Sequence, residues 1–187
     1  MRLPGPDLIG MLYGLSEMVL AAIKRSRGDV VRADRHSLRL LWMTILGSVA
    51  VAVLAPALVP RAHSALLETL YPLGLLLFVL GLALRWWSIV HLGRFFTVDV
   101  AIAADHRVVD TGPYRVLRHP SYSGLLLAFL GFGMCLCNWL SVAVLLFPIT
   151  FAILGRIAVE EAALRHSLGA AYIDYARRTR ALVPGLY

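Results

Sequence analysis

The sequence predicts an all-α, polytopic membrane protein with about five transmembrane helices and a cytosolic C-terminal helical cap. Three observations support this fold class. The composition is 59% hydrophobic and only 16% charged, which is too apolar for a soluble domain of this length. Apolar runs of membrane-spanning length follow one another along the chain. The segments between these runs are alternately basic and nearly free of basic residues, as loops on opposite sides of a membrane are.

The net charge is +7, and a basic protein of this kind could bind nucleic acid if its charges formed one stripe. The charges instead fall in clusters between the apolar runs. We therefore predict membrane lipids, and no nucleic acid, as partners. The oligomeric state has no signature in the sequence.

Five apolar runs are candidate spans. A transmembrane helix needs about 20 predominantly apolar residues, and about 17 are tolerated. Four runs meet or approach that length: 40–59, 65–90, 122–137 and 140–155. The first run, 8–23, is the weakest because Ser16 and Glu17 interrupt it. It either spans the membrane or lies in the interface as an amphipathic helix, and we favour a span.

Basic residues set the orientation, since short cytoplasmic loops retain Lys and Arg. Six basic residues precede the second run, whereas only Arg61 follows it. Arginines return after the third run and after the last, while the Asn138-Trp139 turn carries no charge. With five spans the N-terminus lies outside, and the loop 93–120 shares the cytosolic side with the tail 157–187.

The Asn138-Trp139 turn is too short for anything but a tight hairpin between the last two runs. This hairpin should bring Arg118-His119 near Arg156 and Glu160. No internal repeat appears, so we predict a single domain, 1–187, in which residues 1–92 form the N-terminal spans and residues 93–187 carry the functional site. The tail 156–180 is predicted to form two short cytosolic helices that Gly169 separates.

The segment 110–124, DTGPYRVLRHPSYSG, is the strongest candidate for a site. It places arginine, histidine, tyrosine and two prolines at the mouth of a membrane segment, where a simple connector needs only a turn. Pro120 holds His119 at a helix start, for which Ser121 is a fair N-cap. The alternative is that Arg118-His119 only anchors the cytosolic end and that Tyr122 is an interfacial aromatic residue.

Charged residues near the membrane ends have two interpretations each. Arg156 and Glu160 stand four apart on one helix face, where they form either an ordinary ion pair or a grip on a polar ligand whose remainder lies in lipid. Arg85 lies about two turns inside the third run, and we expect it to extend to the interface rather than to act as an intramembrane functional charge. Glu17 is similarly ambiguous.

Metal, disulfide and targeting signals are not predicted. Cys135 and Cys137 point to different helix faces, which disfavours both a disulfide and a metal site. The histidines other than His119 have no ligand-like spacing, so we predict no metal. No small-residue cleavage site follows the first apolar stretch, so we predict no signal peptide.

The stretch 93–186 resembles the isoprenylcysteine carboxyl methyltransferase family. The resemblance rests on LGRFFT, HRVVDTGPY, RHPSYSG, the Cys137-Asn138 pair, the tail VEEAALRHSLGAAYIDYARR and the closing LVPGLY, in the family's order and nearly at its spacing. RHPxYxG alone is shared with related phospholipid and thiol methyltransferases. The paired glutamates and the final proline make the combination specific, whereas the N-terminal third matches only as membrane spans.

The resemblance implies a membrane enzyme of prokaryotic type, with a cytosolic S-adenosylmethionine pocket and a lateral opening for a lipidated, prenylated acceptor. An inner-membrane location follows. The cofactor-binding residues that it implies are His106, Arg107, Val108, Val109, Tyr114, His119, Pro120, Ser121, Tyr122 and Glu160. Arg156 falls at the position of an arginine that binds the substrate carboxylate, and Arg156 and His119 are the implied catalytic residues.

The chemistry agrees with these roles. A carboxylate is ionised at pH 7 and needs no general base to attack a sulfonium methyl group, so positioning and desolvation must supply the rate. Two alternatives remain at this stage. One keeps the cofactor but methylates a phospholipid amine or a small thiol. The other is a non-enzymatic membrane scaffold or carrier that binds phosphate headgroups through Arg115 and Arg118.

Overall fold

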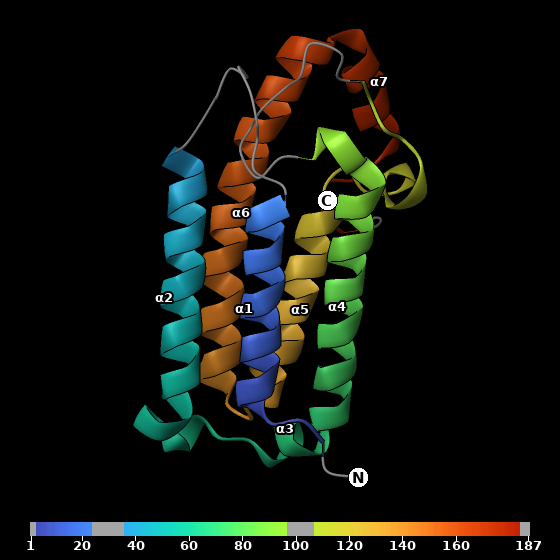
Figure 1. Cartoon of the computed structure of the whole chain (residues 1–187). Coiled ribbons are helices and arrows are strands. Elements are labelled where there is room, and N and C mark those ends of the chain that lie inside the picture. Colours follow the sequence, from blue (N-terminus) through green and yellow to red (C-terminus); the bar gives the residue numbers. More distant parts are fainter. Residues whose placement is uncertain (1–2, 24–35, 97–106, 184–187) are drawn as a thin grey trace.

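The computed structural model describes residues 3–23, 36–96 and 107–183 (Figure 1). Within these ranges the chain is helical, and its only β-type pairings are two isolated bridges. The helices are α1 (Pro6–Ile23), α2 (His36–Leu58), α3 (Ala65–Thr69), α4 (Tyr71–Leu92), α5 (Pro120–Cys135), α6 (Trp139–Leu168) and α7 (Ala170–Arg178), with 3-10 turns η1 (Pro60–Ala62), η2 (Gly93–Phe95) and η3 (Gly112–Arg115).

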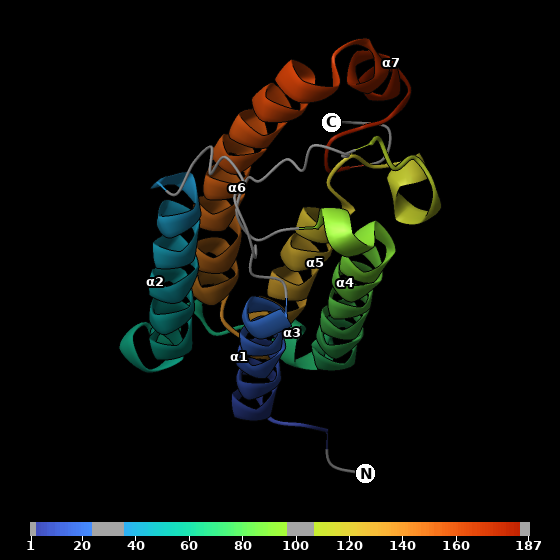
Figure 2. The ribbon, with the colours of Figure 1, turned by 45° about the horizontal axis from the view of Figure 1, so that its top comes forward.

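Among the residues that the structure describes, three helical segments are long and apolar enough to cross a membrane: α2, the stretch Tyr71–Phe95 and α6. Helix α5 is apolar but shorter. The predicted all-α membrane fold is confirmed, while the count of five spans stays a prediction. Figures 1 and 2 show α1, α2, α4, α5 and α6 as one bundle, with α7 beyond the end opposite α3.

Helices α4 and α5 are packed backbone against backbone, because glycines replace side chains along their seam. A Cβ on Gly124 would lie 2.6 Å from the carbonyl oxygen of Gly81 and 2.7 Å from the backbone nitrogen of Arg85. A Cβ on Gly131 would collide with the backbone of Gly74 and Phe78. Small residues allow this close approach inside membranes. The seam consequently fixes the start of α5 relative to α4.

The predicted hairpin at Asn138 is confirmed, and Asn138 is its centre. The side-chain oxygen of Asn138 accepts hydrogen bonds from the backbone nitrogens of Leu140 (3.0 Å) and Ser141 (3.3 Å), which caps α6. Its amide donates to the carbonyl of Val59 at 3.2 Å. The hairpin makes α5 and α6 neighbours, as the short turn requires.

Two predicted helix starts were wrong, because in each case a proline occupies the first turn of the observed helix. The run 65–90 divides at Leu70 into α3 and α4, because α4 begins anew with Pro72 in its first turn, where proline is tolerated. Helix α5 begins at Pro120 with His119 as its N-cap residue. Ser121 therefore lies inside the first turn, and the prediction that it caps the helix was wrong.

The tail also differs from the prediction. Helix α6 continues without interruption from Trp139 through Arg156 to Leu168, so the first of the two expected short helices is the far end of a spanning helix. Gly169, at φ +55°, ends α6 and precedes α7, which confirms the predicted break. Because α6 is continuous, Arg156 and Glu160 are held on one rigid element.

Candidate functional site

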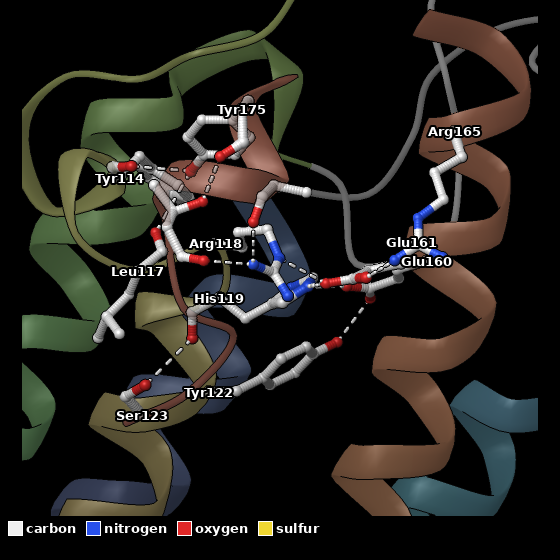
Figure 3. Close-up of polar contacts among 12 residues, drawn as sticks. Tyr114, Leu117, Arg118, His119, Tyr122, Ser123, Glu160, Glu161, Arg165 and Tyr175 are labelled. Atoms are coloured by element: carbon white, nitrogen blue, oxygen red, sulfur yellow. Dashed lines mark hydrogen bonds and ion pairs between the residues drawn. The ribbon is translucent and has the colours of Figure 1, made fainter. Parts of the chain in front are cut away.

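The site is built around Glu160, on the part of α6 that extends beyond the start of α5. The Tyr122 hydroxyl donates to Oε1 of Glu160 at 2.6 Å, and Nε of Arg156 donates to the same oxygen at 2.9 Å. The Nδ1 of His119 lies 3.5 Å from Oε2. Figure 3 shows His119 and Tyr122 on the loop and first turn of α5, both directed toward Glu160. The structure thus joins four of the predicted site residues.

Glu161 forms a second carboxylate centre next to the first. It accepts from Nε of Arg118 and from Arg165, each at 2.7 Å. His119 Nε2 lies 3.4 Å from Glu161, so the imidazole sits between two carboxylates. Glu161 was not among the predicted site residues, although the paired glutamates in VEEAALRH were the signal that could have found it.

The environment of His119 favours its charged form. Burial acts to lower the pKa of the imidazole, but the adjacent carboxylates of Glu160 and Glu161 outweigh burial and raise this pKa above the usual value of 6.5. An imidazolium at this place would balance part of the negative charge of the two glutamates.

The loop that carries His119 is tied to the C-terminal segment. Arg118 donates from Nη1 to the carbonyls of Ala176 (3.1 Å) and Thr179 (2.6 Å), and its backbone nitrogen donates to the carbonyl of Arg180 at 2.7 Å. The Tyr175 hydroxyl donates to the carbonyl of Tyr114 at 2.8 Å. Residues 179–181 therefore run alongside residues 116–119 and hold the loop against the end of the bundle.

The other predicted cofactor residues are placed differently. Tyr114 is buried, and its hydroxyl donates to the carbonyl of Ser88 at 3.3 Å. This hydrogen bond attaches the loop to α4. Arg107 is exposed, and Val108 and Val109 are half-buried. Within the described part of the chain, no side-chain hydrogen bond or ion pair connects these three residues to the glutamates. His106 lies outside the described residues.

Arg85 does not extend to the interface, so that prediction was wrong. It is buried and forms a two-point ion pair with Glu17 of α1, at 2.7 and 2.9 Å. The pair removes the need to reach water, because each charge finds its counter-charge within the bundle. Sequence could not reveal the partner, which lies 68 residues away. Arg85 also donates to the Ser121 hydroxyl at 3.1 Å.

Arg156 is almost fully buried, with 1% of its surface exposed. Besides Glu160, it donates to the Ser37 hydroxyl of α2 at 2.9 Å. Arg118, Arg156 and a charged His119 lie shielded from solvent beside Glu160 and Glu161. Cationic side chains are thus gathered at the end of an apolar bundle.

Comparison with known proteins points to one family. The model of the isoprenylcysteine carboxyl methyltransferase (ICMT) family matches residues 74–166. Protein-S-isoprenylcysteine O-methyltransferase B of Arabidopsis thaliana is 30% identical over 181 residues, which cover 93% of this chain and 88% of the plant protein. A protein-S-isoprenylcysteine O-methyltransferase of Saccharomyces cerevisiae is 34% identical over 114 residues, 60% of this chain and 48% of the yeast protein.

A solved structure gives the same result for the fold. The eukaryotic intramembrane Ras methyltransferase ICMT (isoprenylcysteine carboxyl methyltransferase) matches with a TM-score of 0.64 and 26% sequence identity. The match covers 82% of this chain but 55% of the solved chain. The chain thus spans little more than half of that protein, and the match includes most of the bundle described above.

Proposed function

Because this chain belongs to the isoprenylcysteine carboxyl methyltransferase family, we propose that it methylates the carboxylate of an isoprenylcysteine-like, lipidated acceptor with S-adenosylmethionine as methyl donor. The observation that carries this proposal is the polar cluster of His119, Arg156, Glu160 and Tyr122 at the end of an apolar bundle. Such a place allows a polar reacting group to meet buried charges while an apolar tail remains in lipid.

The guanidinium of Arg156 favours an anionic acceptor. It is positively charged and planar, and this shape orients a carboxylate through paired hydrogen bonds. Arg156 is held in place by Glu160 on one side and by Ser37 on the other. We propose that it fixes the orientation of the acceptor carboxylate and that His119 assists as the second catalytic residue.

The engagement of both glutamates also supports a carboxylate acceptor. An amine or thiol acceptor must lose a proton, whereas a carboxylate is already ionised at pH 7. Glu160 accepts hydrogen bonds from Tyr122 and Arg156, and Glu161 accepts them from Arg118 and Arg165. Carboxylates that are engaged in this way are weak bases, because their charged form is stabilised.

The residues fit the proposed cofactor in charge and shape. When bound, S-adenosylmethionine supplies a methyl group on a positively charged sulfur. Glu160 can pair with an ammonium group, and the rings of His119 and Tyr122 stack 6.0 Å apart beside it, a surface suited to an aromatic base or a cation. Nε2 of His119 is buried and faces Oε1 of Glu161 at 3.4 Å, so the imidazole is held in place beside this surface.

We extend the cofactor site to further residues on the basis of the family resemblance. His106, Arg107, Val108 and Val109 would contribute through their backbone, and Tyr114, Pro120 and Ser121 would shape the wall that carries His119. We also propose that the chain works as one domain, with this site on the cytosolic face of a prokaryotic inner membrane.

The experiment is a transfer assay with labelled S-adenosylmethionine and purified protein in nanodiscs. N-acetyl-S-farnesylcysteine, a phospholipid amine and a small thiol are offered separately. We expect label only in the farnesylcysteine. Label in the amine or the thiol instead would move the function to the alternative acceptor class, and failure to bind the donor would rule out a methyltransferase.

A further inference from the structure

Helix α1 is connected to the site through a buried ion pair. Glu17 and Arg85 are 5% and 7% exposed, respectively, and the guanidinium is engaged on two sides. Nε and Nη2 of Arg85 donate to the two carboxylate oxygens of Glu17 at 2.7 and 2.9 Å. The remaining nitrogen, Nη1, donates to Ser121, at 3.1 Å to the hydroxyl and 3.5 Å to the carbonyl.

Ser121 is the link to the proposed chemistry. It belongs to the first turn of α5, directly between His119-Pro120 and Tyr122. His119 and Tyr122 both contact Glu160. The first turn of α5 is therefore bonded to two charged groups, to Arg85 through Ser121 and to Glu160 through its neighbours.

The glycine seam explains how Arg85 reaches this turn. A Cβ on Gly124 would lie 2.7 Å from the backbone nitrogen of Arg85, so α4 and α5 touch at the level of the ion pair. At this separation the Arg85 side chain is long enough to contact both Glu17 of α1 and Ser121 of α5. The seam therefore sets the distance between α4 and α5, and the ion pair with Glu17 sets the direction of the guanidinium.

A simple fastening of α1 to α4 does not require these charges. The Trp86 indole already donates to the Ser16 hydroxyl at 2.6 Å and joins the same two helices. A buried ion pair is often no more stabilising than a well-packed apolar contact, because both ions lose their hydration. Its distinctive property is directional, since a guanidinium fixed at two points presents its third nitrogen at a defined place.

We propose that Arg85, oriented by Glu17, is a positioning residue that fixes the first turn of α5 and with it His119 and Tyr122. Helix α1 is then part of the active-site scaffold as well as of the membrane bundle. The inference about turnover rests on the proposed methyl transfer, whereas the inference about the turn can be measured without it.

The test compares three variants of the full chain in nanodiscs. Arg85→Lys keeps the charge but cannot bond Glu17 at two points and Ser121 as well. The double variant Glu17→Met/Arg85→Met replaces the ion pair by an apolar contact between α1 and α4 and removes both hydrogen bonds to Ser121. Ser16→Ala is the matched control, because it removes an α1–α4 hydrogen bond in which α5 takes no part.

Two quantities are measured: hydrogen exchange of the segment 117–123, and methyl transfer to N-acetyl-S-farnesylcysteine. In both Arg85 variants the backbone amide hydrogens of this segment should exchange about tenfold faster than in wild type, as expected for loss of one buried charged hydrogen bond. Their kcat should fall about tenfold or more, with a smaller change in KM. Ser16→Ala should leave both quantities within about twofold of wild type.

The outcomes distinguish two roles of the Glu17–Arg85 pair, positioning of the first turn of α5 and simple attachment of α1 to α4. Recovery of wild-type exchange and kcat in the double variant would show that the pair only fastens α1, and wild-type behaviour of Arg85→Lys would also overturn the proposal. If the wild type transfers no methyl group, the proposed function fails, and the exchange data still decide whether Arg85 fixes the turn. Should the double variant not fold, Arg85→Lys alone decides.

Discussion

Replacing Glu160 by glutamine is the sharpest perturbation of the proposed cofactor site. The change keeps the size of the side chain and removes its charge. Three groups then face a neutral amide in place of a carboxylate: Tyr122 at 2.6 Å, Arg156 at 2.9 Å and His119 at 3.5 Å. The glutamine oxygen can still accept one strong hydrogen bond, so the substitution weakens the cluster without emptying it.

The size of the effect follows from the charge-assisted hydrogen bonds that the substitution removes. A hydrogen bond to a charged group contributes about 1.5–3 kcal/mol. If Glu160 pairs with the ammonium of the cofactor, removing one such bond should weaken S-adenosylmethionine binding about 10- to 150-fold. The Glu160 side chain is 22% exposed, so water can partly replace the missing charge, and we expect the lower half of this range.

The assay is equilibrium binding of labelled S-adenosylmethionine to purified protein in nanodiscs. Glu68→Gln is the matched control, since Glu68 also contacts a histidine, Nε2 of His63 at 3.2 Å, but lies on α3 at the opposite end of the bundle (Figure 1). The control should bind like wild type. An unchanged Kd in Glu160→Gln, with the melting temperature also unchanged, would refute the placement of the cofactor at Glu160.

The seam, the histidine and the arginine each allow one more test. Gly81→Ala should lower the free energy of unfolding by about 1–3 kcal/mol, since its Cβ would meet the backbone of α5, whereas Gly155→Ala, with open space around the Cβ, should not destabilise; equal melting temperatures would contradict the seam. The raised pKa of His119 means that its ion pairs stabilise the fold fully below about pH 6.5 and are lost as pH rises through the higher folded pKa. The melting temperature of the wild type should therefore fall with rising pH in this range, and that of His119→Gln should not. Parallel plots of melting temperature against pH for the two proteins would contradict this expectation. Arg156→Lys should reduce kcat/KM for the farnesylcysteine acceptor about 10- to 150-fold with a smaller effect on cofactor affinity; the reverse pattern would assign Arg156 to the cofactor.

Local patterns in the sequence were sufficient for the membrane bundle and for the meeting of α5 and α6. Apolar length predicted the long apolar helices of the bundle, and the brevity of the Asn138-Trp139 turn predicted the hairpin. The hairpin in turn brought His119 to the same end as Glu160. Each of these inferences depends on residues that are close in the chain or on a single short connection.

Contacts between distant segments were beyond such reasoning. Arg85 was expected to need water because its partner, Glu17, is on another helix, and nothing in the local pattern reveals that pairing. The same applies to Arg118, whose acceptors lie at Ala176 and Thr179. The continuity of α6 was missed because charges beyond Arg156 resemble a cytosolic tail, although a helix can continue into water once its first turns are fixed.

The central claim is tested most directly by offering N-acetyl-S-farnesylcysteine and its methyl ester to the same purified protein with labelled S-adenosylmethionine. The free acid has a carboxylate to methylate, and the ester differs from it only in that group. We predict that label enters the free acid as a base-labile ester and does not enter the methyl ester. Base-stable label in either compound, or equal labelling of both, would contradict the assignment of a carboxyl methyltransferase.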